Sequence, residues 1–278
     1  MAIENQFRRI GVIGLGSVGK AVKHALSFYH PCTGYDILGE YSWEDTLDTS
    51  VVFICVPTPE GGDGRLDCSI VESVLSKLSS SRYTGVVVIK STIGVGFMDE
   101  AVTEYPDLRL VYMPEFLRER SNFTWFVNPD RLVFSGDEED VEEVLQYFAW
   151  VEDDVPVLRM THREAELGKL AHNAYIALKV SFTNEIEQIS HERSADPAHV
   201  MSVIWADRRV LSREHLRPGF GAYAGKCVPK DTRELINASG CATLLQAAED
   251  LNNRILAHEE AVPGKDAAAL CEMNRNTA

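Results

Sequence analysis

The stretch GVIGLGSVGKA at residues 11–21 sets three glycines between a short apolar run and a helical pattern. Gly14, Gly16 and Gly19 have the G-x-G-x-x-G spacing, and Asp36 ends the next predicted strand. Glycines at this spacing permit a tight turn and let a pyrophosphate approach the N-terminus of a helix, while the carboxylate binds the adenosine ribose. The stretch therefore predicts a dinucleotide-binding strand, loop and helix. A turn with incidental glycines is the alternative.

The choice of cofactor follows from Asp36. Its negative charge would repel the 2′-phosphate of NADP, and no arginine directly follows it in the sequence. NAD is therefore the predicted cofactor. The predicted contacts in this part of the chain are Gly14, Gly16, Ser17, Val18, Gly19 and Asp36.

The remainder of the first half alternates apolar runs with helical patterns. The apolar runs lie at 51–57, 85–92, 108–116 and 131–136, and the clearest helical patterns at 69–80 and 138–150. Alternating strands and helices are typical of a parallel sheet covered on both faces, and continuous apolar strands agree with that burial. The predicted fold class is α/β, with a Rossmann-type, doubly wound parallel sheet in an NAD-binding domain at residues 1–160.

The pattern changes near residue 161. Thr161 and Glu164 fit a capping box, and no proline follows until after Ala195, so a helix of some 30 residues should begin there. Shorter helices are predicted around 197–213 and from about Pro229. The second predicted domain is therefore an all-helical substrate and dimerisation domain at 161–258, followed by a tail at 259–278.

Composition narrows the classes of partner. The chain has 278 residues, of which 45% are apolar, and a formal net charge of −15. It can bury a full core, and its charge argues against a nucleic acid or an anionic membrane as partner. No apolar run reaches about 18 residues and no secretory signal is present, so the predicted location is the cytoplasm. The six cysteines lack zinc-ligand spacing, so no metal is predicted.

The segment GFGAYAGKCVPKD at 219–231 places Cys227 between two lysines. Pro229 and Asp231 suit the first turn of a helix, so the thiol should lie at a helix N-terminus. The helix end and the ammonium groups would lower the pKa of the thiol. A thiolate beside a nicotinamide can attack an aldehyde, and the thiohemiacetal can then lose hydride to give a thioester. A structural cysteine in a tight loop is the alternative.

Lys169 and Asn173 lie four residues apart on the predicted long helix. This spacing puts both side chains on the same helical face. An ammonium and an amide together can donate hydrogen bonds to one developing oxyanion. Two solvated surface residues are the alternative for this segment taken alone.

Seven motifs in a fixed order carry a resemblance to a known family. They are GLGSVG, FICVPTP (53–59), KSTIGVGF (90–97), MPEFLRE (113–119), NPDRLV (128–133), KLAHNAYIALKVSFTNE (169–185) and CVPKD (227–231). Together they resemble the UDP-glucose/GDP-mannose dehydrogenase family over roughly residues 9–255. That family oxidises the C6 alcohol of a nucleotide sugar to a carboxylate with two NAD. The resemblance thus implies a nucleotide-sugar substrate such as UDP-glucose.

The resemblance also implies catalytic roles. Cys227 would be the nucleophile, and Lys169 and Asn173 would contact the oxyanion and the substrate hydroxyl. Asp231 would partner the water or lysine that takes the first proton. The remaining pair would position water for the acid–base steps and for thioester hydrolysis, and consists of Thr92 and Glu119.

Binding roles follow from the same resemblance. Further cofactor contacts would be Pro57, Thr58, Thr92 and Lys230. Substrate contacts would be Glu115, Phe116, Leu117, Lys169, Asn173, Arg209, Phe220, Gly221 and Tyr223. Among them, Arg209 would reach the sugar end of the substrate, often across a dimer interface.

The sequence departs from the family pattern in three places. The family's loop reads Gly-Phe-Gly-x-Gly-Gly-x-Cys, whereas GFGAYAGKC at 219–227 is one residue longer and has Ala224 at a usual glycine, which could reshape the sugar pocket. Arg120 replaces a residue that is usually small. The family continues into a third domain that grips the nucleotide, whereas this sequence ends at Ala278, so a short form without that domain is expected.

The leading hypothesis is a four-electron oxidation through a Cys227 thiohemiacetal and thioester. One alternative is a two-electron alcohol dehydrogenase like the β-hydroxyacid dehydrogenases, which also use a lysine and an asparagine four residues apart and would not need Cys227. Another is a non-catalytic NAD-binding protein. In each case, exposed apolar positions on the helix at 163–194 predict a homodimer through the helical domain.

Overall fold

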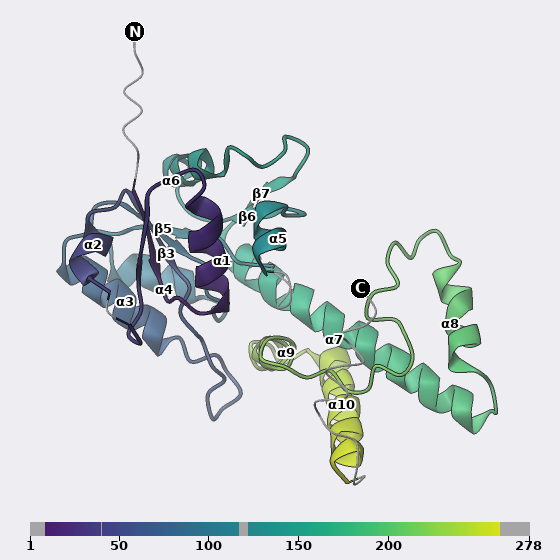
Figure 1. Ribbon diagram of the computed structural model, residues 1–278. Coiled ribbons are helices and arrows are strands. Elements are labelled where there is room, and N and C mark those ends of the chain that lie inside the picture. The colour runs from purple at the N-terminus through teal and green to yellow at the C-terminus, as the bar shows by residue number, and fades with distance from the viewer. Residues whose placement is uncertain (1–8, 40, 117–121, 262–278) are drawn as a thin grey trace. The chain divides into compact units, whose positions relative to one another are not determined.

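The computed structural model describes residues 9–39, 41–116 and 122–261 (Figure 1). The chain forms two compact units, whose sequences meet between Lys169 and Leu170. The described strands all belong to the first unit, and the described elements of the second are helices. The predicted α/β sheet followed by a helical region is therefore confirmed. The domain boundary at residue 160 stays a prediction, and most of the predicted tail lies outside the described residues.

The first unit is built on a five-stranded parallel sheet in the order β2-β1-β3-β4-β5. The strands are β1 (Ile10–Ile13), β2 (Cys32–Tyr35), β3 (Val51–Ile54), β4 (Val86–Ile89) and β5 (Arg109–Tyr112). Ile13 pairs with both Tyr35 and Ile54, so the strands end together at one edge of the sheet. The strand order reverses direction between β1 and β3, and the crevice at such a point is where open α/β sheets bind ligands.

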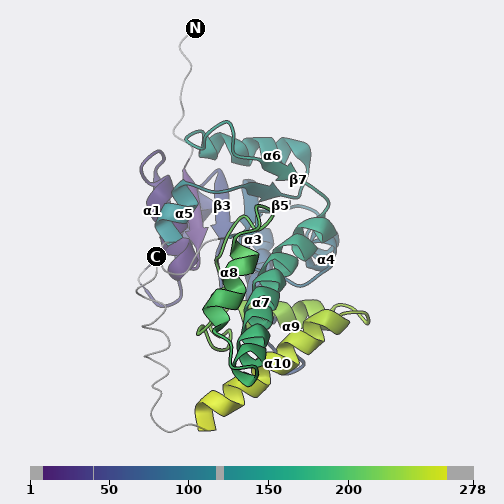
Figure 2. The ribbon, with the colours of Figure 1, turned by 90° about the vertical axis from the view of Figure 1, so that its right-hand side faces the viewer.

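Helices cover both faces of this sheet. One face carries α1 (Ser17–Leu26), α5 (Asn122–Val127) and α6 (Glu138–Leu145), followed by a 3₁₀ turn at Gln146–Phe148; the other carries α2 (Trp43–Leu47), α3 (Ser69–Ser80) and α4 (Phe97–Glu104). Val51 and Phe53 point to the first face, and Val52 and Ile54 to the second. Helices α1 and α5 lie side by side (Figure 1 and Figure 2). Burial on both faces explains the continuous apolar strands.

The predicted strand at 131–136 belongs to a separate small sheet. It forms β6 (Leu132–Phe134), which pairs in parallel with β7 (Val157–Arg159). Tyr112 and Ser135 join it to β5 through two backbone hydrogen bonds of 2.8 and 3.0 Å. Strand β7 has three exposed residues and no apolar run that could have predicted it.

The long helix α7 (His162–Glu192) begins where the capping box predicted. The Thr161 backbone N–H donates to Glu164 Oε2 at 2.8 Å, and the Glu164 N–H donates to Thr161 Oγ1 at 3.4 Å. The remaining helices are α8 (Pro197–Trp205), α9 (Val228–Asn237) and α10 (Thr243–Ala261). Within the described ranges, no helix has the length and apolar character needed to cross a membrane.

Helix α8 ends eight residues before the predicted boundary at 213. The Asp207 carboxylate accepts the backbone N–H of Arg209 at 2.9 Å. This local turn competes with the helical hydrogen-bond pattern and leads the chain out of α8.

Candidate active site

The glycine loop after β1 has the shape that a dinucleotide requires. Gly14 has φ +85°, and a Cβ there would lie 2.8 Å from the Cys55 carbonyl group. A Cβ on Gly19 would lie 1.8 Å from the Gly14 oxygen, whereas one on Gly16 would meet nothing within 4 Å. Gly16 is also the N-cap of α1 and has no side chain to cap the first amides. Two glycines thus permit tight packing, and the third leaves open space at the helix N-terminus for a pyrophosphate.

Asp36 lies beside this loop, and its role as a ribose ligand stays a prediction. Its Oδ2 accepts the Leu15 N–H at 2.7 Å, and its Oδ1 accepts the Leu38 N–H at 2.9 Å. These bonds fix the carboxylate at the end of β2. Each oxygen has a second lone pair for a ribose hydroxyl. The described loop and carboxylate therefore fit NAD.

The predicted threonines meet at the carboxyl ends of β3 and β4. Thr58 is buried and donates its hydroxyl to the Thr92 carbonyl oxygen at 2.7 Å. Ser91 donates to the Val56 carbonyl oxygen at 2.7 Å and ties the same two segments together. Pro57 is exposed beside them. Of the other residues predicted nearby, Leu117, Glu119 and Arg120 lie outside the described residues.

Cations gather around Phe116 in the first unit. The Arg131 guanidinium lies 4.0 Å from the centroid of the Phe116 ring, and Lys169 Nζ lies 5.2 Å from it. Sequence reasoning predicted Phe116 and Lys169 but missed Arg131. Both cations interact favourably with the same Phe116 ring, and these two contacts hold its side chain in place.

Lys90 is a second residue that the sequence reasoning missed. Only 3% of it is exposed, and Nζ donates to the Met113 carbonyl oxygen at 3.1 Å. Burial lowers the pKa of Lys90 to about 8, while the charges of Cys55 and Glu115 act in the opposite direction. The bond fixes the segment that leads from β5 to Glu115. The sequence signal that could have identified Lys90 is its position at the end of the apolar run GVVVIK.

Three predicted residues of the second unit come together in one cluster. Asp231 is fully buried, and its Oδ2 accepts the Asn173 amide Nδ2–H at 2.5 Å. Lys230 Nζ donates to the other carboxylate oxygen, Oδ1, at 2.7 Å. The cluster joins α7 to the first turn of α9. A buried carboxylate with two such donors is held in one position and can act on a proton beside it.

Cys227 lies one helical turn from this cluster. It is the N-cap of α9, its side chain is exposed, and its carbonyl oxygen accepts the Asp231 N–H at 3.0 Å. Pro229 occupies the first turn of the helix, as predicted. The thiol thus stands at the helix N-terminus, which favours an anionic sulfur.

His172 was assigned no role from its sequence position. Its Nδ1 lies 3.1 Å from Asn173 Oδ1. Since Asn173 directs its NH₂ group at Asp231, its Oδ1 must accept, and we assign the ring proton to Nδ1. Helical spacing did not predict this contact, because adjacent residues on a helix point in different directions and His172 and Asn173 meet only at the ends of their side chains. His172 orients the amide that contacts Asp231.

The other predicted substrate residues have different surroundings. Arg209 is highly exposed, and its NH2 pairs with Asp207 Oδ2 at 2.5 Å. Phe220 is half-buried and its ring lies 6.3 Å from that of His215. The Gly221 carbonyl oxygen accepts Asn184 Nδ2–H at 2.7 Å, and Tyr223 is buried. Glu115 is also half-buried.

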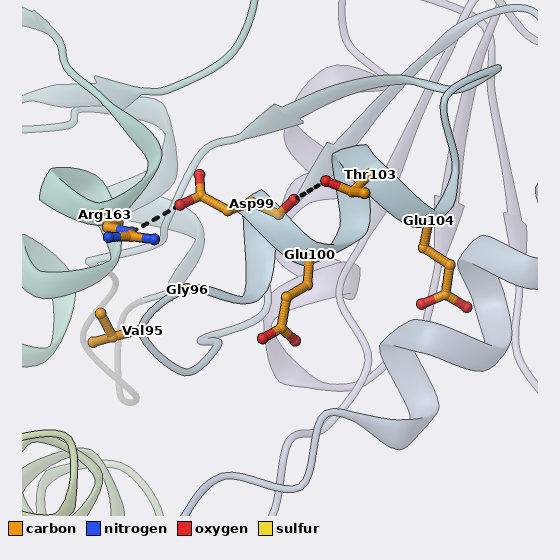
Figure 3. A pocket seen from close by; sticks show the side chains of 7 residues that line it. All are labelled: Val95, Gly96, Asp99, Glu100, Thr103, Glu104 and Arg163. Atoms are coloured by element: carbon orange, nitrogen blue, oxygen red, sulfur yellow. Dashed lines mark hydrogen bonds and ion pairs between the residues drawn. The ribbon is translucent and has the colours of Figure 1, made fainter.

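A hollow of about 650 Å³ runs along one side of α4, and none of these residues lines it. Its lining is Val95, Gly96, Asp99, Glu100, Thr103, Glu104 and Arg163 (Figure 3). Arg163 Nε donates to Asp99 Oδ2 at 2.8 Å, and Thr103 Oγ1 donates to the Asp99 carbonyl oxygen at 2.8 Å (Figure 3). No residue predicted for the cofactor or the substrate lines it. Size alone therefore does not make it the active site.

A loop shaped for a dinucleotide, followed by a helical unit with a buried cluster of ionisable groups, is an arrangement typical of NAD-dependent dehydrogenases. Residues 40–149 match the NAD binding domain of the UDP-glucose/GDP-mannose dehydrogenase family, and residues 163–254 match its central domain. The chain belongs to this family. The matched regions confirm the resemblance and the NAD-binding role of the first unit.

Individual relatives agree with the family match. The UDP-glucose 6-dehydrogenase of Streptococcus pneumoniae is 33% identical over 219 residues, 72% of this chain and 55% of that protein. The GDP-mannose 6-dehydrogenase of Pseudomonas aeruginosa is 34% identical over 68% of this chain and 46% of its own length. A solved UDP-glucose dehydrogenase from the archaeon Pyrobaculum islandicum has a TM-score of 0.80 at 27% identity, covering 93% of this chain and 70% of that one. The chain spans about half the length of the curated relatives it matches.

Proposed function

We propose that this protein oxidises the C6 alcohol of a nucleotide sugar, with UDP-glucose as the first candidate, to the carboxylate. The observation that carries the proposal is the buried Asp231, bonded to Asn173 and Lys230 one turn from the Cys227 thiol. Membership of the family and the names of its relatives support this substrate class. When bound, NAD supplies the hydride acceptor for an alcohol oxidation.

The first oxidation needs a base and an oxyanion contact. Asp231, or a water beside it, takes the proton of the C6 hydroxyl as the alcohol carbon becomes an aldehyde. Lys169 and Asn173 stand four residues apart on α7 and donate to the oxygen that gains negative charge. A primary amide has two N–H groups, so Asn173 can serve Asp231 and the substrate together.

The second oxidation uses the thiol. The Cys227 thiolate forms a C–S bond to the aldehyde carbon, and the aldehyde oxygen takes up a proton to give a thiohemiacetal. The thiohemiacetal would then lose that proton and a hydride, with a second NAD as the hydride acceptor, and become a thioester. Water then attacks the thioester carbon, the C–S bond breaks, and the carboxylate leaves as the thiol takes back a proton. On the family pattern, Thr92 and Glu119 position this water, and Arg209 reaches the sugar end of the substrate.

The test is the number of NADH formed per UDP-glucose consumed, measured for the wild type and for Cys227→Ala. Two NADH for the wild type, with loss of the second in the variant, support the four-electron reaction. One NADH in both proteins contradicts it and favours a two-electron dehydrogenase. NAD binding without any NADH across a panel of nucleotide sugars favours a non-catalytic protein. Cys241→Ala is the matched control, because Cys241 is also exposed but lies at the opposite end of α9.

We also propose that the active form is a homodimer through α7. Tyr175, Phe182 and Ile189 lie seven residues apart and are 62%, 44% and 48% exposed. Apolar residues at this spacing form one continuous stripe, which is typical of a helix that packs against a partner helix. Phe182→Glu should lower the mass measured by light scattering from that of two chains to that of one. An unchanged mass would exclude this face from the interface.

A further inference from the structure

The loop that precedes Cys227 is held from two helices at several points. On the α7 side, the Gly219 N–H donates to Glu187 Oε2 at 2.7 Å, and Asn184 Nδ2–H donates to the Gly221 carbonyl oxygen at 2.7 Å. Asn184 and Glu187 lie three residues apart and therefore share one face of α7. The first part of the loop is thus fixed to that face.

Helix α10 fixes the middle of the same loop through Tyr223. The Tyr223 backbone N–H donates to Asn252 Oδ1 at 2.8 Å, and Asn252 Nδ2–H donates back to the Tyr223 carbonyl oxygen at 3.0 Å. One buried amide therefore satisfies both main-chain groups of a single residue. Such a reciprocal pair restrains the backbone at that residue much as a strand partner would.

The Tyr223 side chain enters the interior of the second unit. Only 5% of the residue is exposed, and its ring packs with Ala177, Val180 and Val228. Its hydroxyl donates to the buried carboxylate of Glu249. Burial and this bond raise the pKa of Tyr223, so the hydroxyl remains a protonated donor.

Helix α9 also contributes to the group of side chains around Tyr223 and Glu249, here called the Tyr223 cluster. Arg233 NH1 donates to the other oxygen of Glu249 at 2.7 Å, which balances the buried negative charge. Val228 and Arg233 both belong to α9, whose N-cap is Cys227. Tyr223 is therefore connected by apolar contact, and through Glu249, to the helix that carries the thiol.

We propose that Tyr223 is a positioning residue for Cys227. With Tyr223 fixed, the three residues between it and Cys227 start from a set point, and Cys227 remains at the N-terminus of α9. This inference rests on the proposed function for the role of Cys227.

The experiment compares Tyr223→Phe with Glu249→Gln, two variants that keep the size of the side chain. The control is Tyr29→Phe, the same chemical change on a half-exposed tyrosine of the first unit. The first readout is the rate of Cys227 alkylation by iodoacetamide between pH 6 and about 10, followed by mass spectrometry of the Cys227 peptide. The second is NADH formation from UDP-glucose, with kcat and KM measured separately.

Tyr223→Phe and Glu249→Gln should each move the pH midpoint of Cys227 alkylation upward by about one unit, because the Cys227 thiol leaves the helix N-terminus for part of the time. They should lower kcat about tenfold and leave the KM for NAD unchanged. Variants that melt earlier yet keep the wild-type alkylation profile and kcat would overturn the proposal, since the cluster would then only stabilise the fold. A shifted alkylation profile in a protein that forms no NADH would support the positioning role and reject the proposed function.

Discussion

Asn173 Nδ2 donates to Asp231 Oδ2 at 2.5 Å, across a separation of 58 residues in the sequence. The bond joins the middle of a long helix to the first turn of a short one. Because Asp231 is fully buried, its carboxylate depends on Asn173 and Lys230 for compensation. The bond therefore holds α7 and α9 together and also positions the carboxylate proposed as the base of the reaction.

Replacing Asp231 with Asn should therefore affect stability and activity together. Removal of one partner leaves the Lys230 ammonium without its carboxylate, so we expect a loss of about 3 kcal/mol in the free energy of unfolding. The loss of a base should lower kcat by at least about 100-fold. Urea denaturation and steady-state NADH formation measure the two effects. A stable variant with wild-type kcat would remove Asp231 from the mechanism.

His172→Ala should lower kcat more than it lowers stability. Without the ring N–H, the Asn173 amide can rotate and no longer presents its NH₂ group only to Asp231 and the substrate. We expect a decrease of about tenfold in kcat, with a melting temperature near that of the wild type. His199→Ala is the control, because His199 is a highly exposed histidine on α8. Equal kcat values for the two variants would contradict an orienting role for His172.

Lys90→Met should change how stability depends on pH. The folded pKa of Lys90 is lowered from 10.5 to about 8, so between these values the unfolded chain binds more protons than the folded one. The free energy of unfolding of the wild type therefore gains a contribution that rises with pH through this window and is absent below it. The methionine variant lacks this contribution. Urea denaturation at pH 7, 8, 9 and about 10 should show that the free energy of unfolding of the wild type, minus that of the variant, rises with pH. A constant difference would refute the lowered pKa of Lys90.

The glycine loop offers a matched pair of substitutions. Gly19→Ala would place a Cβ 1.8 Å from the Gly14 oxygen and should destabilise the fold by more than about 3 kcal/mol. Gly16→Ala meets nothing within 4 Å and should leave the melting temperature unchanged. It should still weaken NAD binding about tenfold, because the methyl group occupies the approach to the first amides of α1. Calorimetry of NAD binding separates the two effects, and wild-type affinity in Gly16→Ala would show that the cofactor does not approach there.

Much of the first unit was predictable because its signals are local. Strands β1, β3 and β4 are short, continuous, buried runs, and the glycine loop and the Thr161–Glu164 capping box each act over a few residues. Elements without such signals were missed. Strand β7 is exposed, and α2 and α5 contain only five and six residues.

The sequence by itself determined the class of fold, the cofactor and the residue types available for chemistry, because backbone conformation and hydrophobic periodicity are properties of neighbouring residues. Only the tertiary structure decided which of those residues lie in contact. Asn173 meets Asp231 across 58 residues, Lys90 reaches Met113 across 23, and Tyr223 meets Asn252 across 29. Each contact exists because burial leaves a polar group that must find a partner, and packing rather than sequence spacing determines which partner is within reach.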